Sequence, residues 1–408
     1  MRLFERVLGA AIREGELTVI DAAGQTFRFG KPAEGRPPVA VRFTSDRALR
    51  RCMLSPALGT GEAYMNGQLQ MVDGDIHALV DLVTWNGRFE RYDPKTSMDR
   101  RLHLSNDLFG WWRAYNQERR SRRNVAHHYD LSAELYDLFL DKDRQYSCAY
   151  FTDPANSLDQ AQADKKAHIA AKLALEPGQR VLDIGCGWGG LALYLHQKAG
   201  VDVLGITLSE EQLKIARERA AAAGVSDHVR FELIDYRKLE GRFDRIVSVG
   251  MFEHVGPGHF RPYLAKCRSL LAEDGVMLLH TIGRMGTRRS TDPWTTKYIF
   301  PGGYVPTLSE ISEAAEATRM ITSDVEVLRL HYALTLEHWL RRTQAHRAEI
   351  ETLYDARFFR MWEFYLASSL TGFTNGQMVN FQIQYVRDRR ALPITRDYMA
   401  PAEQALKA

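Results

Sequence analysis

Cysteine is scarce in this sequence and nowhere clustered. The chain has four cysteines in 408 residues, and no two of them are spaced as a CxxC motif. So sparse a set excludes a disulfide framework and a cysteine-based metal or redox motif. It favours a reducing compartment, and we therefore expect a cytoplasmic protein without a metal site.

A charge excess is also missing. The 54 Lys and Arg residues minus the 51 Asp and Glu residues leave a net charge of +3. So small an excess argues against a dedicated nucleic-acid-binding protein, although it allows a local basic patch. The 26% of charged and 45% of hydrophobic residues are ordinary for a globular protein, which excludes a disordered chain, a fibre and a coiled coil. The length predicts two or three domains.

No segment resembles a signal peptide or a transmembrane helix. Arg13, Glu14 and Glu16 interrupt the apolar residues at the start of the chain. The longest uncharged run, 364–386, holds many Ser, Thr, Asn and Gln side chains, which would be costly in hydrocarbon. We therefore expect any contact with a membrane to be at its surface.

The first part of the chain divides into a small domain and a linker. Residues 1–105 mix short alternating stretches such as LTVIDAAGQTFRFG with helix-like ones, which indicates an α+β domain. Residues 106–126 form a basic aromatic linker, in which five arginines lie beside or after Trp111, Trp112 and Tyr115: Arg113, Arg119, Arg120, Arg122 and Arg123. Two interpretations stay open: a solvated linker, or a strip that lies against anionic lipid head groups.

The remaining residues, 127–408, predict a catalytic domain of the doubly wound α/β class. From Asp159 onward, strand-like stretches (QRVLDI, VDVLGITL, HVRFELID, FDRIVSVG, VMLLHTIG) alternate with helical ones. This alternation predicts right-handed crossovers and a mostly parallel sheet with covered faces. After Gly283 the pattern gives way to loops and long helices. One of these helices has an aromatic stripe, which is usual for core but could line a channel: Tyr354, Phe358, Trp362 and Tyr365.

The segment VLDIGCGWGG, 181–190, is the most informative one. An apolar strand ends at Asp183, and the chain turns through Gly185, Gly187 and Gly189 into a helix. Glycine is needed where backbone approaches a ligand closely or takes a positive φ. A dinucleotide site also uses a Gly-rich turn. The acid in D-x-G-x-G favours an S-adenosylmethionine site instead, because a carboxylate there orients an ammonium group.

The next two strand ends supply further candidates for the cofactor. The second strand ends at Thr207 and Leu208, with Gln212 one helical turn on. Ser209 is typical of a helix N-cap, and the acids after it suit the first turn of a helix without any ligand. The third strand is followed by Asp235 and Tyr236, a polar group and a ring that could hold adenine.

Six motifs in order carry a family resemblance over about residues 125–390. They are HYDLS, QYSCAYF, DIGCGWG, GITLSEEQ, VGMFEHVG and HTIG. The sequence resembles the cyclopropane-fatty-acyl-phospholipid synthases and is similar to the mycolic-acid cyclopropane synthases. Its first hundred residues resemble the extra N-terminal domain of the phospholipid enzymes, with GTGEAYMNGQL as the best match. That domain favours a phospholipid substrate.

The resemblance implies a reaction and the residues that carry it out. A methyl group passes from S-adenosylmethionine to a cis double bond of a phospholipid acyl chain, and a bound bicarbonate ion then removes a proton so that a cyclopropane ring closes. The implied bicarbonate site is Cys148, Glu253, His280, Ile282 and, by the loosest match, Tyr332. The cofactor contacts, with the acid argued above, are Tyr129, Tyr146, Ser147, Asp183, Gly185, Gly187, Thr207, Leu208, Gln212, Asp235 and Tyr236.

This chemistry is consistent with the residue types. Attack of an alkene on a sulfonium methyl creates a carbocation, so the site must be dry, and aromatic faces can stabilise the cation. The motifs supply six rings: Tyr146, Tyr150, Phe151, Trp188, Phe252 and Tyr332. Taken singly, Cys148 suits a buried apolar position, His280 a core position and Glu253 a helix cap. Their joint presence in the motifs favours the site, whereas His254 is interpreted as structural.

Three other functions are alternatives to cyclopropane synthesis. A lipid methyltransferase on the same scaffold would give methyl-branched chains. An amine N-methyltransferase is disfavoured because it needs no bicarbonate cluster, and a non-catalytic lipid-binding protein is disfavoured because neither motif set is eroded. We expect an unsaturated phospholipid as partner, peripheral contact with the inner face of a membrane, and, from the resemblance, a homodimer bridged by the N-terminal domains.

Overall fold

The computed structural model describes residues 2–91 and 131–407. Contacts divide the described chain into two compact units. The first contains the residues before 92 together with Thr291–Pro301 and Ala333–Met378. The second contains the residues from 131 to Ser290 together with Gly302–Tyr332 and the residues from Val379 on. Thus two segments from the later part of the chain, predicted above to lie in the domain 127–408, pack with the N-terminal residues.

The first unit has a four-stranded sheet in the order β2-β1-β3-β4. Strand β1 is antiparallel to β2 and parallel to β3, and β4 is antiparallel to β3. Alternate residues of β1 and β3 are buried, as the alternating sequence predicts. The strands are β1 (Gly15–Ile20), β2 (Thr26–Lys31), β3 (Val39–Phe43) and β4 (Leu69–Asp73).

Helices from three parts of the sequence complete this unit. α16 packs against α3 and α4, and α12 packs against α3. The predicted aromatic stripe is confirmed for Phe358, Trp362 and Tyr365, which lie on α16, and the ring of Trp362 contacts that of Tyr365. For Tyr354 the prediction of one continuous helix is wrong, because Tyr354 is the C-cap of α15 and α16 begins only at Ala356, although its ring still stacks on Phe358. The helices are α1 (Arg2–Ala11), α2 (Asp46–Leu54), α3 (Pro56–Met65), α4 (Ile76–Asn86), η1 (Phe89–Arg91), α12 (Pro293–Tyr298), α15 (Arg347–Leu353) and α16 (Ala356–Thr374), together with most of α14 (His331–Ala345).

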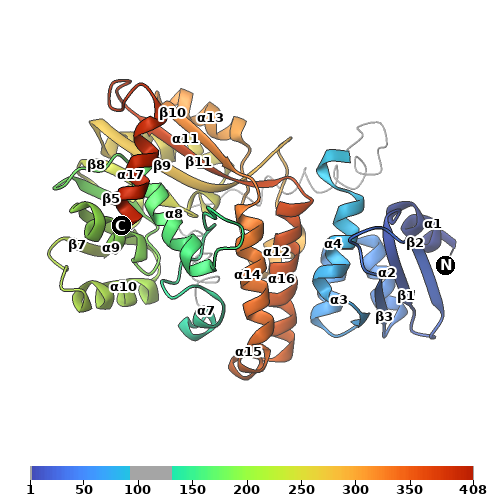
Figure 1. The fold of residues 1–408 in the computed structure, drawn as a ribbon. Helices are drawn as coiled ribbons and strands as arrows, with labels where there is room; N and C mark the ends of the chain where they lie inside the picture. The colour runs from blue at the N-terminus through green and yellow to red at the C-terminus, as the bar shows by residue number, and fades with distance from the viewer. Residues whose placement is uncertain (1, 92–130, 408) are drawn as a thin grey trace. The chain divides into compact units, whose positions relative to one another are not determined.

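The second unit is built on a seven-stranded sheet in the order β10-β11-β9-β8-β5-β6-β7 (Figure 1). The pairs from β9 to β7 are parallel, whereas β10 and β11 are antiparallel. The order reverses beside β5, which is where ligands bind in open α/β sheets. The strands are β5 (Arg180–Ile184), β6 (Asp202–Thr207), β7 (Val229–Leu233), β8 (Phe243–Val249), β9 (Leu271–Arg284), β10 (Ile321–Leu328) and β11 (Met378–Val386).

Helices cover both faces of this sheet. Along β5, Leu182 and Ile184 belong to a core cluster shared with α11 and α13, whereas Val181 belongs to a second cluster shared with α8, α9 and α10. The helical segments are α7 (Ala133–Phe139), α8 (Leu158–Lys172), α9 (Gly190–Ala199), α10 (Glu210–Ala222), η2 (Tyr236–Lys238), η3 (Phe252–His254), η4 (Pro257–His259), α11 (Phe260–Leu270), α13 (Leu308–Ala317), η5 (Arg396–Tyr398) and α17 (Met399–Lys407).

This arrangement confirms the predicted class, a doubly wound α/β sheet with a small N-terminal α+β domain. The sequence also predicts a helical acyl-binding insertion; the helices are present, and their acyl-binding role stays a prediction. The predicted basic aromatic linker, 106–126, lies outside the described residues. Among the helices of the described ranges, none is both long and apolar enough to cross a membrane.

Candidate active site

The Gly-rich turn after β5 has the conformation that its sequence predicts. Gly185, Gly187 and Gly189 all have a positive φ, at 84°, 54° and 80°. A Cβ atom on Gly189 would lie 2.6 Å from Cζ of Phe231, so the position also lacks room for a side chain. The turn therefore exposes its backbone where α9 begins.

A pocket opens at this edge of the sheet. Its wall includes ten of the eleven residues predicted to contact the cofactor, while the eleventh, Tyr129, lies outside the described residues. The ten come from the segment before α8, from β5 and the Gly-rich turn, from the end of β6 and the start of α10, and from the residues after β7: Tyr146, Ser147, Asp183, Gly185, Gly187, Thr207, Leu208, Gln212, Asp235 and Tyr236.

Asp183 gives this pocket its chemical character. Its side chain is buried, and within the described residues its Oδ2 atom has no hydrogen-bond partner. Burial raises the pKa of Asp183 to about 7, against the opposing charge of Lys165. A buried carboxylate oxygen without a partner is costly, and an ammonium group would satisfy it. The pocket therefore fits the amino-acid end of S-adenosylmethionine.

The end of β6 is held by its own side chains. Thr207 donates a hydrogen bond from Oγ1 to Oε1 of Gln212 over 3.0 Å. The predicted N-cap is confirmed, because Oγ of Ser209 accepts from the backbone N–H of Gln212 at the start of α10. These bonds fix the strand end against the pocket wall.

The pair Asp235–Tyr236 has partners that the sequence did not suggest. Both carboxylate oxygens of Asp235 accept hydrogen bonds from the guanidinium of Arg237, at 2.9 and 2.6 Å. The ring of Tyr236 packs edge-on against Tyr263, and Arg237 itself lines the pocket. Tyr236 thus remains the better candidate for contact with adenine.

Sequence reasoning missed Lys165, which is fully buried on α8. Its Nζ donates to Oγ of Ser147 over 2.8 Å and to Oε1 of Gln145 over 2.6 Å. Burial lowers the pKa of Lys165 to about 8. The lysine thus ties the pocket segment to α8. Lys165 and Lys172 lie two helical turns apart on the same helix face as the buried Leu158. A lysine on the apolar face of a helix was the feature of the sequence from which a buried role could have been predicted.

Glu253 and Ile282 lie together as predicted, but they are joined by a hydrogen bond between them. The backbone N–H of Ile282 donates to Oε1 of Glu253 over 2.6 Å. Burial raises the pKa of Glu253 to about 7, although the Ile282 hydrogen bond opposes this. Its Oε2 is buried and has no hydrogen-bond partner among the described residues. A protonated Oε2 would need an acceptor nearby.

His280 on β9 is completely enclosed. Its Nε2 lies 2.5 Å from Nδ2 of Asn380, and its Nδ1 lies 3.1 Å from Nε2 of Gln382, both on β11. Burial, together with the charges of Lys165 and Lys172, lowers the pKa of His280 well below its usual range, so the ring is neutral. Both ring nitrogens thus have protein partners.

Cys148 and Tyr332 are both buried, and their roles stay predictions. The Cys148 sulfur lies 3.3 Å from the carbonyl oxygen of Ala149. Tyr332 lies in the first turn of α14, next to His331, whose Nδ1 accepts from the Phe151 backbone N–H over 2.9 Å. The two segments are therefore neighbours, so the fold places Cys148 and Tyr332 in one region.

The structure separates the six candidate rings. Tyr146 and Trp188 line the pocket, and both pack edge-on against Tyr136. Tyr150 instead stacks on His168, and Phe252 stacks on Phe260. Only the first pair faces the space where a cofactor fits.

The sequence predicts only a structural role for His254, but the structure places it at the cofactor pocket. It lines the pocket beside Met251 and Val255. Burial lowers its pKa to about 4, so the imidazole is neutral at neutral pH. Its position directly after Glu253 was the feature of the sequence that could have indicated a place at the site.

These features can be compared with known proteins. The model of the mycolic acid cyclopropane synthetase family matches residues 116–383. The chain belongs to this family. A cyclopropane-fatty-acyl-phospholipid synthase of Escherichia coli (strain K12) is 37% identical over 371 residues, covering 88% of this chain and 91% of that protein. A "Probable fatty acid methyltransferase" of Pseudomonas putida is 37% identical over 83% of this chain and 86% of its own length.

A solved structure agrees with this assignment. The crystal structure of mycolic acid cyclopropane synthase CmaA1 in complex with SAH and CTAB matches with a TM-score of 0.61 and 33% identity, over 65% of this chain and 97% of that one. The resemblance seen in the motifs is thus confirmed, and the chain is a methyltransferase of the cyclopropane synthase family.

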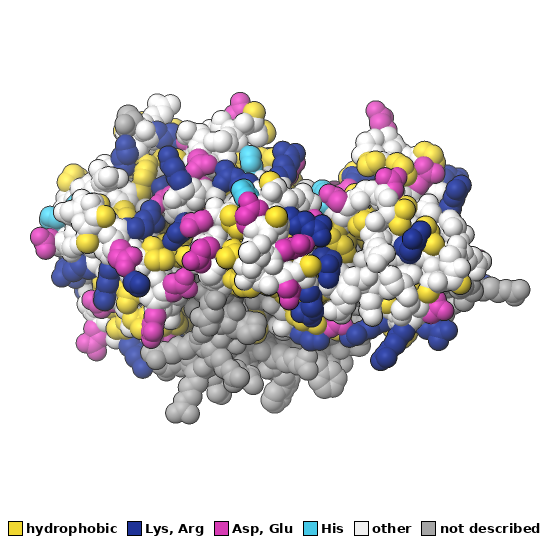
Figure 2. Space-filling view, turned by 90° about the horizontal axis from the view of Figure 1, so that it is seen from below, with side chains coloured by type: hydrophobic (Ala, Val, Ile, Leu, Met, Phe, Trp, Pro, Cys, Tyr) yellow, Lys and Arg dark blue, Asp and Glu magenta, His cyan; other side chains and the backbone are white. Residues whose placement is uncertain are grey.

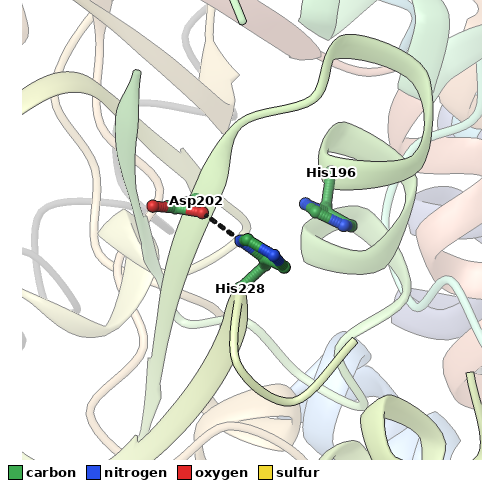
Figure 3. Close-up of side chains that lie close together, drawn as sticks. All are labelled: His196, Asp202 and His228. Carbon is green, nitrogen blue, oxygen red and sulfur yellow. Dashed lines mark hydrogen bonds and ion pairs between the residues drawn. The ribbon is translucent and has the colours of Figure 1, made fainter. Parts of the chain in front are cut away.

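A group of metal-ligand residues lies away from the pocket, near the amino ends of the strands. Ligand atoms of His196, Asp202 and His228 lie within 4.8 Å of one another (Figure 3). However, His228 Nδ1 bonds to Asp202 over 2.8 Å, and His196 Nδ1 bonds to the Val201 carbonyl over 2.8 Å. The two rings are stacked at an interplanar angle of 15°. Stacked rings do not point their nitrogens at a common ion, so the group forms a hydrogen-bonded surface cluster.

Proposed function

We propose that this enzyme transfers a methylene group from S-adenosylmethionine to the cis double bond of unsaturated phospholipid acyl chains, forming a cyclopropane ring. The turn that follows β8 carries the proposal. Met251, His254 and Val255 of this turn line the cofactor pocket. Glu253 stands between them and bonds to Ile282. The proposed cofactor site and the proposed acid–base group therefore share one short segment.

S-adenosylmethionine, when bound, supplies an electrophilic methyl group. The carboxylate of Asp183 would pair with the ammonium group, and the backbone of Gly185 and Gly187 would admit the amino-acid end. Thr207, Leu208 and Gln212 would face the ribose, and Tyr236 the adenine. The partnerless oxygen of Asp183 supports this assignment, because a buried charge needs a counter-charge.

The proposed reaction also calls for a base near the new methyl group, and we assign this role to a bound bicarbonate ion. Glu253 supports this choice. With a pKa near 7, its carboxyl group is partly protonated at neutral pH, and a proton on Oε2 would be donated to an anionic acceptor. The residues proposed for the ion are Glu253, the region of Cys148 and Tyr332, and the Ile282 backbone, whose N–H donates to Glu253 in this structure. His280 was also predicted there, but both of its ring nitrogens contact amides of β11. The ion supplies a base that does not trap a carbocation.

The protein itself contributes to the proposed reaction by burying the predicted site residues away from water. Cys148, Trp188, Tyr332 and His280 are all less than 9% exposed. Buried side chains near the reacting atoms would exclude water, which would otherwise quench a carbocation. The faces of Tyr146 and Trp188 can stabilise positive charge, because the ring quadrupole is negative above the plane.

We further propose that the substrate is reached at the inner surface of a cytoplasmic membrane, by a homodimer. The basic aromatic linker, 106–126, supports surface contact through its charge. In Figure 2, acidic and basic side chains are interspersed over the described surface in view, without a large area of one sign. The charge of the linker sequence makes it our candidate for contact with anionic lipid.

The test is incubation of the enzyme with vesicles of unsaturated phospholipid and methyl-labelled S-adenosylmethionine. Fatty-acid products are then analysed by chromatography and mass spectrometry. Ring formation adds CH₂ and removes the double bond without added hydrogen, whereas a saturated methyl branch adds CH₄. A labelled cyclopropane acyl chain is expected. A branched product would favour the alternative that the Pseudomonas putida relative's name suggests, and no labelled lipid would reject both.

A further inference from the structure

Strand β11 has a buried polar face. Asn380, Gln382 and Gln384 alternate along it, and each is at most 2% exposed. The residues between them, Phe381 and Ile383, join the apolar core on the opposite face of the sheet. Buried amides are costly unless their polar atoms are paired, so this face needs an explanation in terms of its partners.

The partners form a chain of polar contacts that begins at His280. Gln382 lies between His280 and Lys172 of α8. Nε2 of Gln382 is 3.1 Å from Nδ1 of His280, and Oε1 of Gln382 is 2.8 Å from Nζ of Lys172. Lys172 pairs with Glu326 on β10. The chain continues from Glu326 to His168 over 2.7 Å, and from His168 to Glu403 on α17 over 2.7 Å. Figure 1 shows α17 lying beside α8.

The lysine determines the orientation of the glutamine amide. An ammonium group only donates hydrogen bonds, so the amide oxygen of Gln382 must face Lys172. Its NH₂ group must then face Nδ1 of His280. That nitrogen has to accept, and the single proton of the neutral ring is therefore on Nε2.

This deduction also determines the orientation of the Asn380 amide. As placed, its Nδ2 faces Nε2 of His280, and its Oδ1 is buried without a partner among the described residues. If Nε2 carries the proton, the amide must be turned so that Oδ1 accepts it. Amide oxygen and nitrogen are assigned from the hydrogen-bond network. The turn gives Oδ1 a donor and moves the NH₂ group to the position that Oδ1 held.

We propose that Lys172 is a positioning residue that fixes His280, through Gln382, as the neutral tautomer with its proton on Nε2. The assignment deepens the proposed function, on which its catalytic meaning rests. A ring held in this way cannot accept a proton at Nδ1, because that nitrogen is already occupied. The proton released on ring closure must therefore go to a group other than His280 Nδ1.

The ion pairs beyond Lys172 keep its charge in place. Burial would raise the pKa of Glu326, but the hydrogen bond from His168 and the charge of Lys172 lower it to about 2. Glu326 is therefore ionised at neutral pH. Burial lowers the pKa of Lys172, and the negative charge of Glu326 opposes this, which favours the ammonium form that donates to Gln382.

The experiment reads the tautomer directly. The whole enzyme, labelled with ¹⁵N-histidine, is examined by NMR, and the His280 signals are assigned with the His280→Gln variant. The wild-type enzyme should show its proton on Nε2. In Gln382→Glu the new carboxylate only accepts hydrogen bonds, so the proton should move to Nδ1. Lys172→Met should give a mixture, because the amide can then turn.

Lys407→Met is the matched control. Lys407 pairs with Glu403 at the outer end of the network, so its loss should leave the His280 tautomer unchanged. Ring formation should fall at least about tenfold in Gln382→Glu, as is usual when an orienting partner is lost. Calorimetric binding of S-adenosylhomocysteine should stay within about twofold, because Gln382 does not line the pocket.

The outcomes separate this proposal from the proposed function. A wild-type proton on Nδ1, or an unchanged tautomer in Gln382→Glu, would overturn the assignment to Lys172. A changed tautomer with undiminished ring formation would overturn the positioning role. If the wild-type enzyme forms no ring at all, the proposed function fails, while the spectra still decide the tautomer.

Discussion

Among the residues that the structure describes, two buried carboxyl groups each have one oxygen without a hydrogen-bond partner. Asp183 and Glu253 both have a pKa raised to about 7 by burial. In a protein without a ligand such groups reduce stability, and they are retained where a ligand needs them. The two groups differ in the ligand that we expect, a cation for Asp183 and an anion for Glu253.

Glu253 and His280 should matter for turnover and little for cofactor binding. We expect Glu253→Gln and His280→Ala to lower ring formation by at least about 100-fold, because each removes a group that handles or orients a proton. Binding of S-adenosylhomocysteine, measured by calorimetry, should remain within about twofold of the wild-type value. Full activity in both variants would falsify the proposed site.

Asp183 should have the opposite profile. Asp183→Asn keeps the shape of the side chain and removes its charge, so binding of S-adenosylhomocysteine should weaken by about 1.5–3 kcal/mol, the usual contribution of a charged hydrogen bond. Asp202→Asn, at the far end of the neighbouring strand, is the control and should bind normally. Equal affinity in the two variants would mean that no ammonium group pairs with Asp183.

At the scale of elements, some features were predictable and others were not. The Gly-rich turn was predictable because positive φ restricts the choice of residue. The partners of Asn380 and Gln382 were not, because alternating amides on a strand suggest a solvated face, and burial depends on α8 packing from elsewhere in the chain. For the same reason Lys165 was missed, although its position on the buried face of α8 was visible in the spacing.

The tight contact at the Gly-rich turn can be tested with two glycines. Gly189 and Gly178 have similar φ values, 80° and 82°, but only a Cβ on Gly189 would meet a neighbour within 4 Å. Both Ala variants should lose about 1–2 kcal/mol through backbone strain. Gly189→Ala should lose about 1–3 kcal/mol more through its clash with Phe231. Urea unfolding measures both, and equal losses would contradict the clash.

Helix α3 presents a buried acid whose pairing predicts a pH effect. Glu62 pairs with Arg51 and, through Oε1, with Lys297 at 2.7 Å and Tyr298 at 2.8 Å. Burial opposes ionisation, yet these partners lower the pKa of Glu62 below its usual 4.5. Its contribution to stability is therefore present above about pH 4.5 and lost as the pH falls through the lowered pKa.

Glu62→Gln should consequently be less stable than the wild type at neutral pH, by about 1–3 kcal/mol. The difference should shrink as the solution is acidified towards about pH 3, because the wild-type carboxylate then becomes protonated. Thermal unfolding followed over this range checks the prediction. Glu316→Gln, at an exposed position of α13, is the control. A difference that does not change with pH would show that the charge of Glu62 is unimportant.

At the scale of the whole molecule, the proposed phospholipid substrate requires that the enzyme contact a lipid surface. We expect the arginines of the linker to make the first contact. Replacing Arg119, Arg120, Arg122 and Arg123 with Gln should weaken binding to anionic vesicles by up to about 4 kcal/mol, and the residual binding should depend less on salt. Vesicle sedimentation at several salt concentrations measures this.

The control removes the same number of charges from exposed arginines elsewhere, namely Arg47, Arg50, Arg389 and Arg390. Net charge is then equal in the two variants, so only the position of the arginines differs. Vesicle binding that falls equally in both would reduce the linker to a solvated connection.

The composition of the first unit has a consequence for biosynthesis. Because α16 covers α3 and α4, the N-terminal residues cannot finish folding when they leave the ribosome. The apolar surface that α16 covers stays exposed until more than two hundred and fifty further residues have been translated, up to about position 374. Nascent chains of this enzyme should thus depend on chaperones during most of their synthesis, and pauses in translation before α16 should favour misfolding.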